Sequence, residues 1–151
     1  MNIDPLTNSE IESWPKSPLV DLEKPFIDAR GGIQPLVDKL MKSAVMIDSK
    51  AGSIRANHYH KTDWHYCYVI SGAIDYYHRK FGNNEPPELI KVSQGNMVFT
   101  PPLVEHCMKF PVDTKFLTLS RNPRDQITYE ADVVRVQLID PTNSISWSPD
   151  E

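Results

Sequence analysis

Proline is the residue that most limits how this chain can fold, because the sequence holds thirteen prolines against only six glycines. Proline fixes one backbone angle and has no N–H group, so it is excluded from helix interiors and from the central strands of a sheet. We therefore expect the 151 residues to form short strands joined by rigid turns rather than long helices.

Strand-like segments recur about every ten residues after residue 42, and turn residues separate them. In residues 73–80, Ile74, Tyr76 and His78 alternate with polar or aromatic neighbours, which is typical of a strand with two different faces. Many short strands at this spacing predict an all-β sandwich or barrel. The predicted strands cover residues 43–47, 54–60, 64–70, 73–80, 89–92, 97–100, 104–110, 115–120 and 133–138.

The chain is long enough for one domain, and the sequence divides it into three parts. Residues 1–25 are polar and interrupted by prolines, so we interpret them as an extended N-terminal arm, although residues 8–14 could form a single helical turn. This arm is either a loosely attached tail or a segment that packs on a neighbouring subunit, where Trp14 would find cover. Residues 26–140 are predicted to form the barrel, and residues 141–151 a polar C-terminal tail.

Charge, hydropathy and cysteine content together argue against several classes of partner and location. Lys and Arg number 16 and Asp and Glu number 20, which gives a net charge of −4 at pH 7, so we expect no nucleic-acid partner. No apolar run approaches the ~20 residues of a membrane span, and no signal-peptide-like start is present, so we expect no membrane contact. Two cysteines make no disulfide framework, which favours reduced thiols and a cytoplasmic location.

The histidines are the strongest sign of chemistry. His58 and His60 lie two residues apart on a predicted strand, so their imidazoles project from the same face. A short polar turn follows, and His65 would return on the next strand close to this pair. His106 lies on a later strand, and a closed barrel can bring its face against the first two. Imidazole is the commonest side-chain ligand of first-row transition metals, so these residues are candidate metal ligands.

The spacing of these residues resembles the two sequence motifs of the cupin superfamily. The first motif spans Gly52-x5-His58-x-His60-x4-His65-x6-Gly72, and the second spans Gly95-x5-Pro101-x4-His106. The chain departs from the family pattern at three positions, since His65 replaces a glutamate, Leu103 a glycine and Phe110 an asparagine. The resemblance implies a double-stranded β-helix, or jelly-roll barrel. It also implies one divalent metal ion (Fe, Mn, Ni, Cu or Zn) held by His58, His60, His65 and His106.

A second resemblance is to the cupins that act on sugar nucleotides. Asp28-x-Arg30-Gly31 is similar to the entry motif of the dTDP-sugar ketoisomerases, and Arg55-x-x-His58-x-His60-Lys61 is similar to their core motif. The dTDP-4-dehydrorhamnose epimerases share the Arg55-x-x-His58 part of it. This likeness implies that Arg30 and Arg55 contact a diphosphate or sugar and that His58 acts as a catalytic base. Those enzymes generally work without a metal, whereas this chain keeps a full set of metal ligands.

Three functions remain open from the sequence. The first is a cupin that isomerises or epimerises a keto-sugar or nucleotide sugar, with the metal acting as a Lewis acid and with Tyr76 among the aromatic residues that could stack on the substrate. The second is an Fe- or Mn-dependent dioxygenase, and the third is a small-ligand-binding module without catalysis. Cupins commonly pair through edge strands, so we expect a homodimer.

Overall fold

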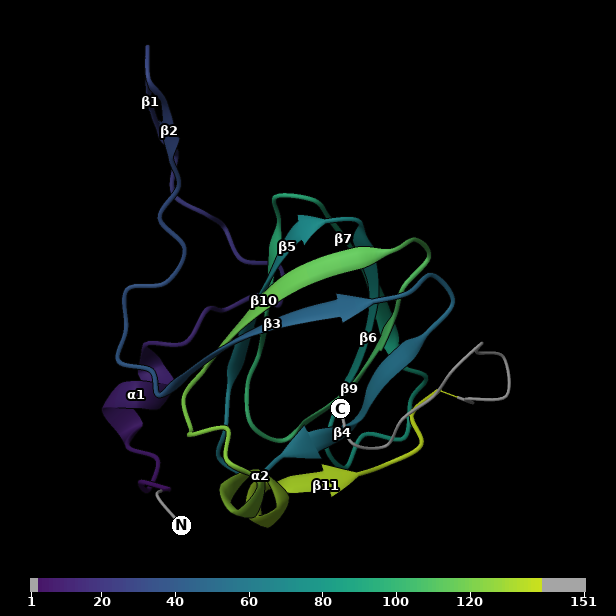
Figure 1. Ribbon diagram of the computed structural model, residues 1–151. Helices are drawn as coiled ribbons and strands as arrows, with labels where there is room; N and C mark the ends of the chain where they lie inside the picture. The colour runs from purple at the N-terminus through teal and green to yellow at the C-terminus, as the bar shows by residue number, and fades with distance from the viewer. Residues whose placement is uncertain (1–2, 140–151) are drawn as a thin grey trace.

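Short antiparallel strands are the main secondary structure of this computed structural model, which describes residues 3–139 (Figure 1). The helices are α1 (Asn8–Glu12) and α2 (Gln126–Asp132), and the strands are β1 (Phe26–Asp28), β2 (Gly31–Ile33), β3 (Ser43–Ser49), β4 (Ile54–His60), β5 (His65–Ser71), β6 (Ala73–Lys80), β7 (Glu88–Ser93), β8 (Met97–Thr100), β9 (Val104–Lys109), β10 (Thr114–Ser120) and β11 (Val133–Arg135). The all-β expectation is confirmed. The predicted tail, residues 141–151, lies outside the described residues.

Two sheets form the barrel. One has the strand order β3-β10-β5-β8, and the other has the order β11-β4-β9-β6-β7. Strands that are neighbours in a sheet are often distant in the chain, so β4 pairs with β9 and β5 pairs with β10. This order brings residues near position 60 beside residues near positions 106 and 120, which is why the site can be built from distant segments.

The chain passes from one sheet to the other at Gly72, between β5 and β6. Gly72 has a φ of +94°, and a Cβ atom added there would lie 2.5 Å from the backbone oxygen of Asp113 and from the Oγ1 atom of Thr114. Only glycine fits this turn without displacing its neighbours. The interior below the turn is filled by aromatic and aliphatic side chains from both sheets, among them Phe110, Phe116, Ile74 and Val92.

The arm differs from the extended tail that we expected. Residues 8–12 form α1, with the Thr7 side chain accepting a hydrogen bond from the Glu10 N–H as its N-cap. The Glu10 carboxylate accepts hydrogen bonds from Arg121 Nε at 2.6 Å and from Trp64 Nε1 at 3.1 Å. The arm therefore packs on the barrel of its own chain. It covers an aromatic cluster on the outer face of the β3-β10-β5-β8 sheet that contains Trp64, Tyr66, Met97 and Phe99.

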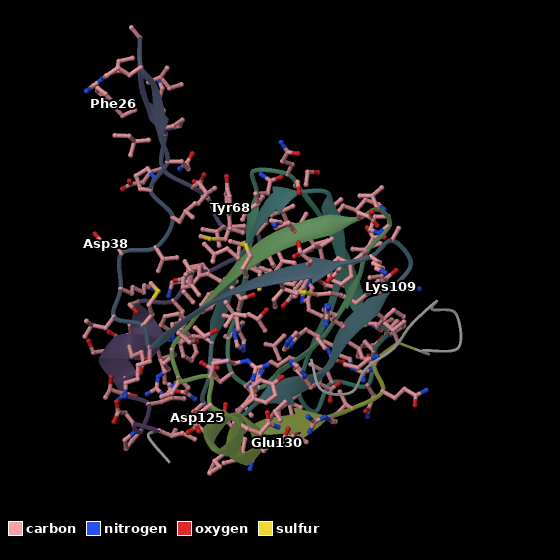
Figure 2. The ribbon with its side chains drawn as sticks, in the orientation of Figure 1. Phe26, Asp38, Tyr68, Lys109, Asp125 and Glu130 are labelled. Carbon is pink, nitrogen blue, oxygen red and sulfur yellow. The ribbon has the colours of Figure 1, made fainter. Side chains whose placement is uncertain are left out.

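Residues 26–42 do not belong to the barrel, contrary to the predicted boundary at residue 26. Residues 26–33 form the two-stranded hairpin β1-β2, which projects away from the barrel (Figure 1). Figure 2 shows Phe26 on this projection, away from the packed side chains of the barrel. Phe26, Ile27 and Ile33 are 60%, 71% and 65% exposed, so this hairpin presents apolar side chains to solvent.

Helix α2 was not predicted from the sequence, and it closes one end of the barrel beside β11 (Figure 1). Asp125 caps it, because its carboxylate accepts a hydrogen bond from the Thr128 N–H at 3.0 Å. Strand β11 ends at Arg135, three residues earlier than predicted. No helix among residues 3–139 is long and apolar enough to cross a membrane.

Candidate functional site

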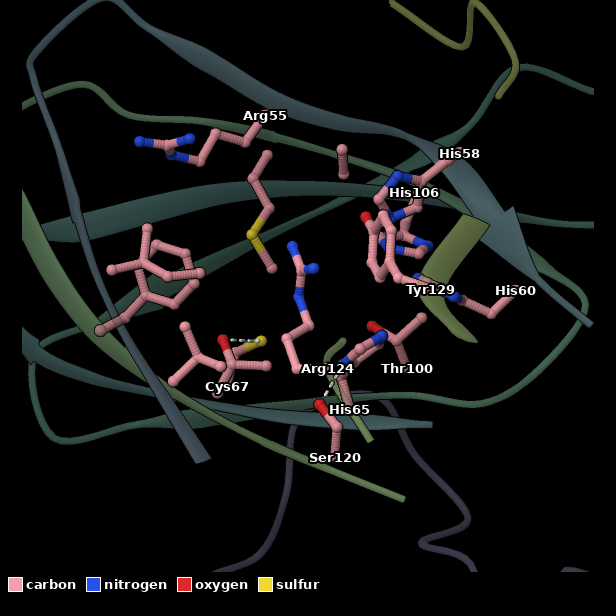
Figure 3. A pocket seen from close by; sticks show the side chains of 16 residues that line it. Arg55, His58, His60, His65, Cys67, Thr100, His106, Ser120, Arg124 and Tyr129 are labelled. Carbon is pink, nitrogen blue, oxygen red and sulfur yellow. Dashed lines mark hydrogen bonds between the residues drawn. The ribbon is translucent and has the colours of Figure 1, made fainter. Parts of the chain in front are cut away.

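A cavity opens between the two sheets, and the four predicted metal-binding histidines line one end of it (Figure 3). Apolar side chains line the cavity as well, among them Val45, Ile47, Met108 and Phe116. The remaining lining residues are Arg55, Ala56, Cys67, Thr100, Thr118, Ser120, Arg124 and Tyr129. The cavity therefore combines a nitrogen-rich group of side chains with hydrophobic surface.

His58 and His106 come together because β4 and β9 are paired in register. They are direct cross-strand partners, and their ring centroids lie 4.7 Å apart. His60 follows His58 on the same face, with ring centroids 4.7 Å apart. One nitrogen from each of the three rings lies within 4.8 Å of the others, and all three residues are buried. The structure thus brings His58, His60 and His106 into one group of potential donors.

A β-bulge in β4 orients His58 toward the cavity. Ala56 pairs with Cys107 of β9, and the next pair is His58 with His106, so Asn57 is an extra residue. Ala56 and Asn57 adopt positive φ angles of 71° and 55°. One extra residue reverses the alternation of side chains along a strand, which turns His58 toward the cavity.

The Asn57 side chain holds this bulge in place. Its Oδ1 atom accepts hydrogen bonds from the N–H groups of Leu138 at 3.1 Å and Ile139 at 3.0 Å. Asparagine is also among the residues that tolerate the left-handed conformation. Because the bulge lies between them, Arg55 and His58 line the same cavity although three positions separate them.

His65 lies on the other sheet, and its nitrogens face protein groups. Its Nδ1 atom is 2.5 Å from the Ser120 hydroxyl, which lies directly opposite on β10, and its Nε2 atom is 3.5 Å from an Asp63 oxygen. Its ring is adjacent to that of His60, with centroids 4.6 Å apart. His60, Asp63 and His65 form a second group of potential donors. The four histidines are therefore neighbours, but His65 can join the group of three only by leaving Ser120 or Asp63.

Unpartnered nitrogens show that the imidazoles suit a metal ion. The Nδ1 atom of His58 and both ring nitrogens of His60 are buried without a hydrogen-bond partner. Burying a polar atom without a partner costs about 1–3 kcal/mol in protein mutational data, so an ion that binds these nitrogens would remove an unfavourable feature of the fold. The Nδ1–H group of His106 donates a hydrogen bond to the Val104 carbonyl oxygen at 2.9 Å, which leaves its Nε2 atom for a ligand.

The electrostatics keep these imidazoles neutral, which is the form that binds metals. Burial lowers the pKa of His58 well below 6.5, and the neighbouring histidines lower it further. Burial likewise lowers the pKa of His65 well below 6.5 and that of His106 to about 3. The pKa of His60 is lowered by burial as well, and Asp132 opposes part of this shift.

The low pKa values predict that the metal-free protein loses stability in mild acid. Unfolding frees each imidazole to take up a proton at its ordinary pKa of 6.5, so this stabilising contribution is complete above pH 6.5 and is lost as the pH falls toward 3. At 1.36 kcal/mol per pH unit, His106 alone contributes a loss of about 2 kcal/mol at pH 5. Asp63 acts in the opposite direction, because burial raises its pKa to about 7 and its contribution falls as the pH rises from 3.8 to 7.

Between pH 7 and pH 5, the stability lost through the four histidines exceeds the stability gained through this one carboxyl group. We therefore expect the urea midpoint to be lower at pH 5 than at pH 7. Urea unfolding in EDTA at the two pH values tests the expectation, and His106→Ala should narrow the difference. Equal stability at the two pH values would show that the imidazoles are not held neutral.

Carboxylates stand behind the imidazoles. An Asp132 oxygen lies 3.5 Å from His60 Nδ1, a long contact, and Asp63 lies at the same distance from His65. Carboxylates placed in this way orient imidazole ligands. Glu105, which precedes His106 in the chain, does not contribute in this way, because its carboxylate accepts hydrogen bonds from Arg79. Asp132 was missed, because it belongs to the unpredicted helix α2.

The predicted substrate-binding residues lie in three different settings. Arg55 lines the cavity, and its guanidinium donates to the Ser49 hydroxyl at 2.7 Å. Tyr76 is fully buried, donates or accepts at 2.7 Å from Thr100 Oγ1, and is absent from the cavity wall. Arg30 lies on the hairpin outside the cavity, 86% exposed and paired with Asp28. Only Arg55 of the three can touch a ligand in the cavity of its own chain.

Two cavity residues escaped the sequence reasoning, Arg124 and Tyr129. Arg124 lies in the charged stretch 121–126, where nothing in the local pattern separates it from an ordinary solvent-exposed turn. The helix that places Tyr129 had a readable signal, since Asp125 precedes a run of helix-compatible residues and is a preferred N-cap type. In the structure, Tyr129 lies beside His60, with ring centroids 5.6 Å apart.

Comparisons with known proteins gave likenesses among solved structures alone, since no family model and no curated protein match the chain. The sugar 3,4-ketoisomerase QdtA from Thermoanaerobacterium thermosaccharolyticum in complex with TDP matches with a TM-score of 0.64 and 20% identity over 78% of this chain and 85% of its own. The dTDP-4-dehydrorhamnose 3,5-epimerase from Sulfolobus tokodaii matches with a TM-score of 0.63 and 16% identity over 82% and 85%. NovW, a 4-keto-6-deoxy sugar epimerase from Streptomyces spheroides, matches with a TM-score of 0.65 and 17% identity over 84% and 76%.

These likenesses confirm the jelly-roll barrel of the cupin type that the sequence motifs predicted. Their identities are all 20% or lower, so they extend to the fold and leave the chemistry to be argued from the side chains in the cavity.

Proposed function

We propose that this protein isomerises or epimerises a keto-sugar, carried as a nucleotide sugar, in the cavity between its two sheets. The observation that carries the proposal is a buried group of neutral imidazoles in the cavity of a barrel whose structural neighbours include a sugar 3,4-ketoisomerase and 3,5-epimerases. Both kinds of reaction begin when a proton leaves the carbon next to a ketone, and buried neutral imidazoles are suited either to hold a Lewis acid that favours this loss or, without a metal, to accept the proton.

We further propose that His58, His60 and His106 hold one divalent transition-metal ion. All three are buried and neutral, and His58 Nδ1 and both ring nitrogens of His60 make no hydrogen bond within residues 3–139, although an Asp132 oxygen lies 3.5 Å from His60 Nδ1. When bound, such an ion supplies Lewis-acid polarisation of a carbonyl oxygen. Imidazole ligands suit Zn, Cu, Fe and Ni alike, so the ligand set alone does not choose among these metals.

The two roles that the sequence assigned to His58 exclude each other while a metal is bound. A neutral imidazole has one lone pair available, and coordination uses it. His58 can therefore act as a general base only in the metal-free protein, and we assign it to the metal. Ser120 and Asp63 orient the ring of His65 on the facing sheet, and Tyr76 supports His106 from behind, with its hydroxyl held by Thr100.

A homodimer is the second part of the proposal, and the β1-β2 hairpin supports it. A two-stranded hairpin alone is at best marginally stable in water, and no other segment among residues 3–139 covers the apolar side chains of Phe26, Ile27 and Ile33. A second copy of this chain would cover them. Arg30 lies outside its own cavity, so any contact of Arg30 with a substrate requires such a second copy.

The double variant Ile27→Asp and Ile33→Asp is expected to be monomeric, because two buried carboxylates would be unfavourable in the proposed interface. Sedimentation equilibrium measures the change against the dimeric wild type. Ile127→Asp is the matched control, since Ile127 is 74% exposed on α2 and should leave the dimer intact. A dimer that persists in the double variant, or a monomeric wild type, would refute the role of the hairpin.

The function itself is tested by solvent exchange. Metal-loaded protein is incubated in deuterium oxide with a panel of nucleotide keto-sugars that begins with TDP-4-keto-6-deoxyglucose, and NMR follows deuterium at the carbons next to the ketone. We expect exchange that falls at least about tenfold after EDTA treatment. Oxygen uptake without exchange would replace the proposal with the dioxygenase, and tight binding without exchange would replace it with a binding module.

A further inference from the structure

The charged side chains that line the cavity, among the described residues, are Arg55 and Arg124, and no Asp or Glu of residues 3–139 lines it. The four histidines are neutral, and the neighbouring carboxylates of Asp63 and Asp132 contact imidazole nitrogens at 3.5 Å outside the cavity lining. In a chain with a net charge of −4, the described cavity wall thus carries a positive field from its guanidinium groups. Guanidinium groups stay protonated at all ordinary pH values, so deprotonation cannot relieve this field and a bound anion can.

Arg124 is the guanidinium that is free to bind such an anion. Its Cζ atom lies 3.8 Å from the ring centroid of Tyr129, and Figure 3 shows the side chain pointing into the middle of the cavity. Within residues 3–139, no carboxylate lies within ion-pair distance of it and it makes no side-chain hydrogen bond. Glu130, the acidic residue nearest in sequence after Asp125, pairs with Arg135 at 2.9 Å. Contact with a ring face leaves the N–H donors of a guanidinium available.

The other arginines nearby have different tasks. Arg121, three positions earlier, is buried and bound to Glu10, to Asn122 and to two backbone oxygens of the arm, so it holds the arm to the barrel. Arg55 is tied to Ser49 and to the Asp48 carbonyl at the cavity wall. Arg124 alone combines a place in the cavity with donors that no described residue engages.

The surroundings of Arg124 also indicate which anion it takes. Its positive charge contributes to the lowered pKa of His60 and of His65, which places it close to the imidazoles. Among the described residues no lysine lines the cavity. The planar donors of a guanidinium match two oxygens of a carboxylate or of a phosphate, but the single positive charge of Arg124 balances a carboxylate and leaves a phosphate dianion with one charge uncompensated. Met108 and Phe116 add apolar surface to the same cavity.

We propose that Arg124 is a carboxylate-binding residue, positioned by Tyr129, and that the ligand of the cavity is an acid whose carboxylate lies between Arg124 and the imidazoles. This inference rests on the proposed function and names its substrate class, a keto-sugar that carries a carboxylate on the sugar ring. It adds a third arginine to the two that the sequence selected and places it inside the barrel of the same chain.

A matched pair of probes tests the inference by binding alone. D-glucuronate and its neutral isostere D-glucuronamide are titrated into EDTA-treated protein, with ligand-observed NMR as the readout. We expect the acid to bind at least about tenfold more tightly than the amide, since an ionised acceptor makes a stronger hydrogen bond to a guanidinium than a neutral amide does. Arg124→Gln should abolish this preference and Arg124→Lys should keep part of it. Lys91→Gln, which removes an exposed charge outside the cavity, should leave it unchanged.

Several results would overturn the inference: equal binding of acid and amide, no binding of either, or a preference that survives Arg124→Gln in folded protein. Inorganic phosphate that competes through Arg124 more strongly than glucuronate would overturn the carboxylate assignment. The test is independent of the proposed function. If the protein prefers the acid but catalyses no deuterium exchange, the isomerase is refuted and the role of Arg124 stands. If it catalyses exchange but binds acid and amide equally, the role of Arg124 is refuted and the isomerase stands.

Discussion

Replacement of His106 with alanine is expected to lower the affinity for zinc at least about tenfold, because it removes one of three nitrogens that converge in the cavity. His106 faces His58 directly across β9 and β4, so no other side chain of these two strands can take its position. His58→Ala should have a similar effect. Competition with a fluorescent zinc chelator, on protein purified without a histidine tag, measures both losses.

His78→Ala is the matched control for these two variants. His78 is the next imidazole on the neighbouring strand β6, is half-buried, and lies 3.6 Å from Glu88, but it belongs to neither group of potential donors. We expect its affinity for zinc to match that of the wild type. Comparable losses in His58→Ala, His78→Ala and His106→Ala would mean that the histidines act through stability and not as ligands.

Gly72→Ala is expected to destabilise the fold by about 3 kcal/mol, the sum of a strained backbone and an overpacked turn. The new Cβ atom would meet the Asp113 carbonyl oxygen and Thr114 Oγ1 at 2.5 Å. Thr114 cannot easily retreat, because its hydroxyl contacts Ala73 N at 3.2 Å and the Val112 carbonyl at 2.9 Å. Urea unfolding in EDTA gives the change in the free energy of unfolding.

Gly82→Ala separates the two causes. Gly82 has a φ of +87°, close to that of Gly72, but a Cβ atom there would meet nothing within 4 Å. We expect it to lose only the backbone contribution, about 1–2 kcal/mol. If both substitutions destabilise the protein equally, the crowding at the junction of the two sheets is not as the structure describes.

The sequence predicted the barrel and the approach of the histidines well, because both depend on local rules. Alternation along 73–80 and turn residues at 71–72 marked strands that the structure contains. The spacing of His58 and His60 predicted a shared face, and the cupin motifs predicted that His106 would join them. The strand predicted over 64–70 also alternates in the structure, with His65 and Cys67 at the cavity and Tyr66 in the outer aromatic cluster.

The details of the site depend on tertiary contacts that no local pattern carries. The bulge at Asn57 is held by backbone groups of Leu138 and Ile139, more than 80 residues later. His65 turns toward Ser120 because β5 pairs with β10 in this register and no other. Asp132 reaches His60 from a helix whose only sequence signal was its N-cap.

The aromatic and basic residues illustrate the same limit. Tyr76 had the character of a stacking residue in the sequence, but cross-strand packing buries it completely behind His106. Arg30 lies on a hairpin that projects away from the barrel and is 86% exposed. The motif predicted a contact between Arg30 and the substrate, which in this structure would require a second copy of the chain. The sequence around Arg124 has the pattern of an ordinary charged loop. Only the tertiary structure, in which α2 places the Tyr129 ring against its guanidinium, identifies it as a cavity residue.

Anomalous scattering from crystals grown with zinc tests the central claim most directly. The account predicts one peak in the cavity, about 2.0–2.1 Å from one nitrogen each of His58, His60 and His106. A peak held instead by His60, Asp63 and His65, or a cavity without a peak at zinc concentrations that saturate the protein in solution, would contradict it.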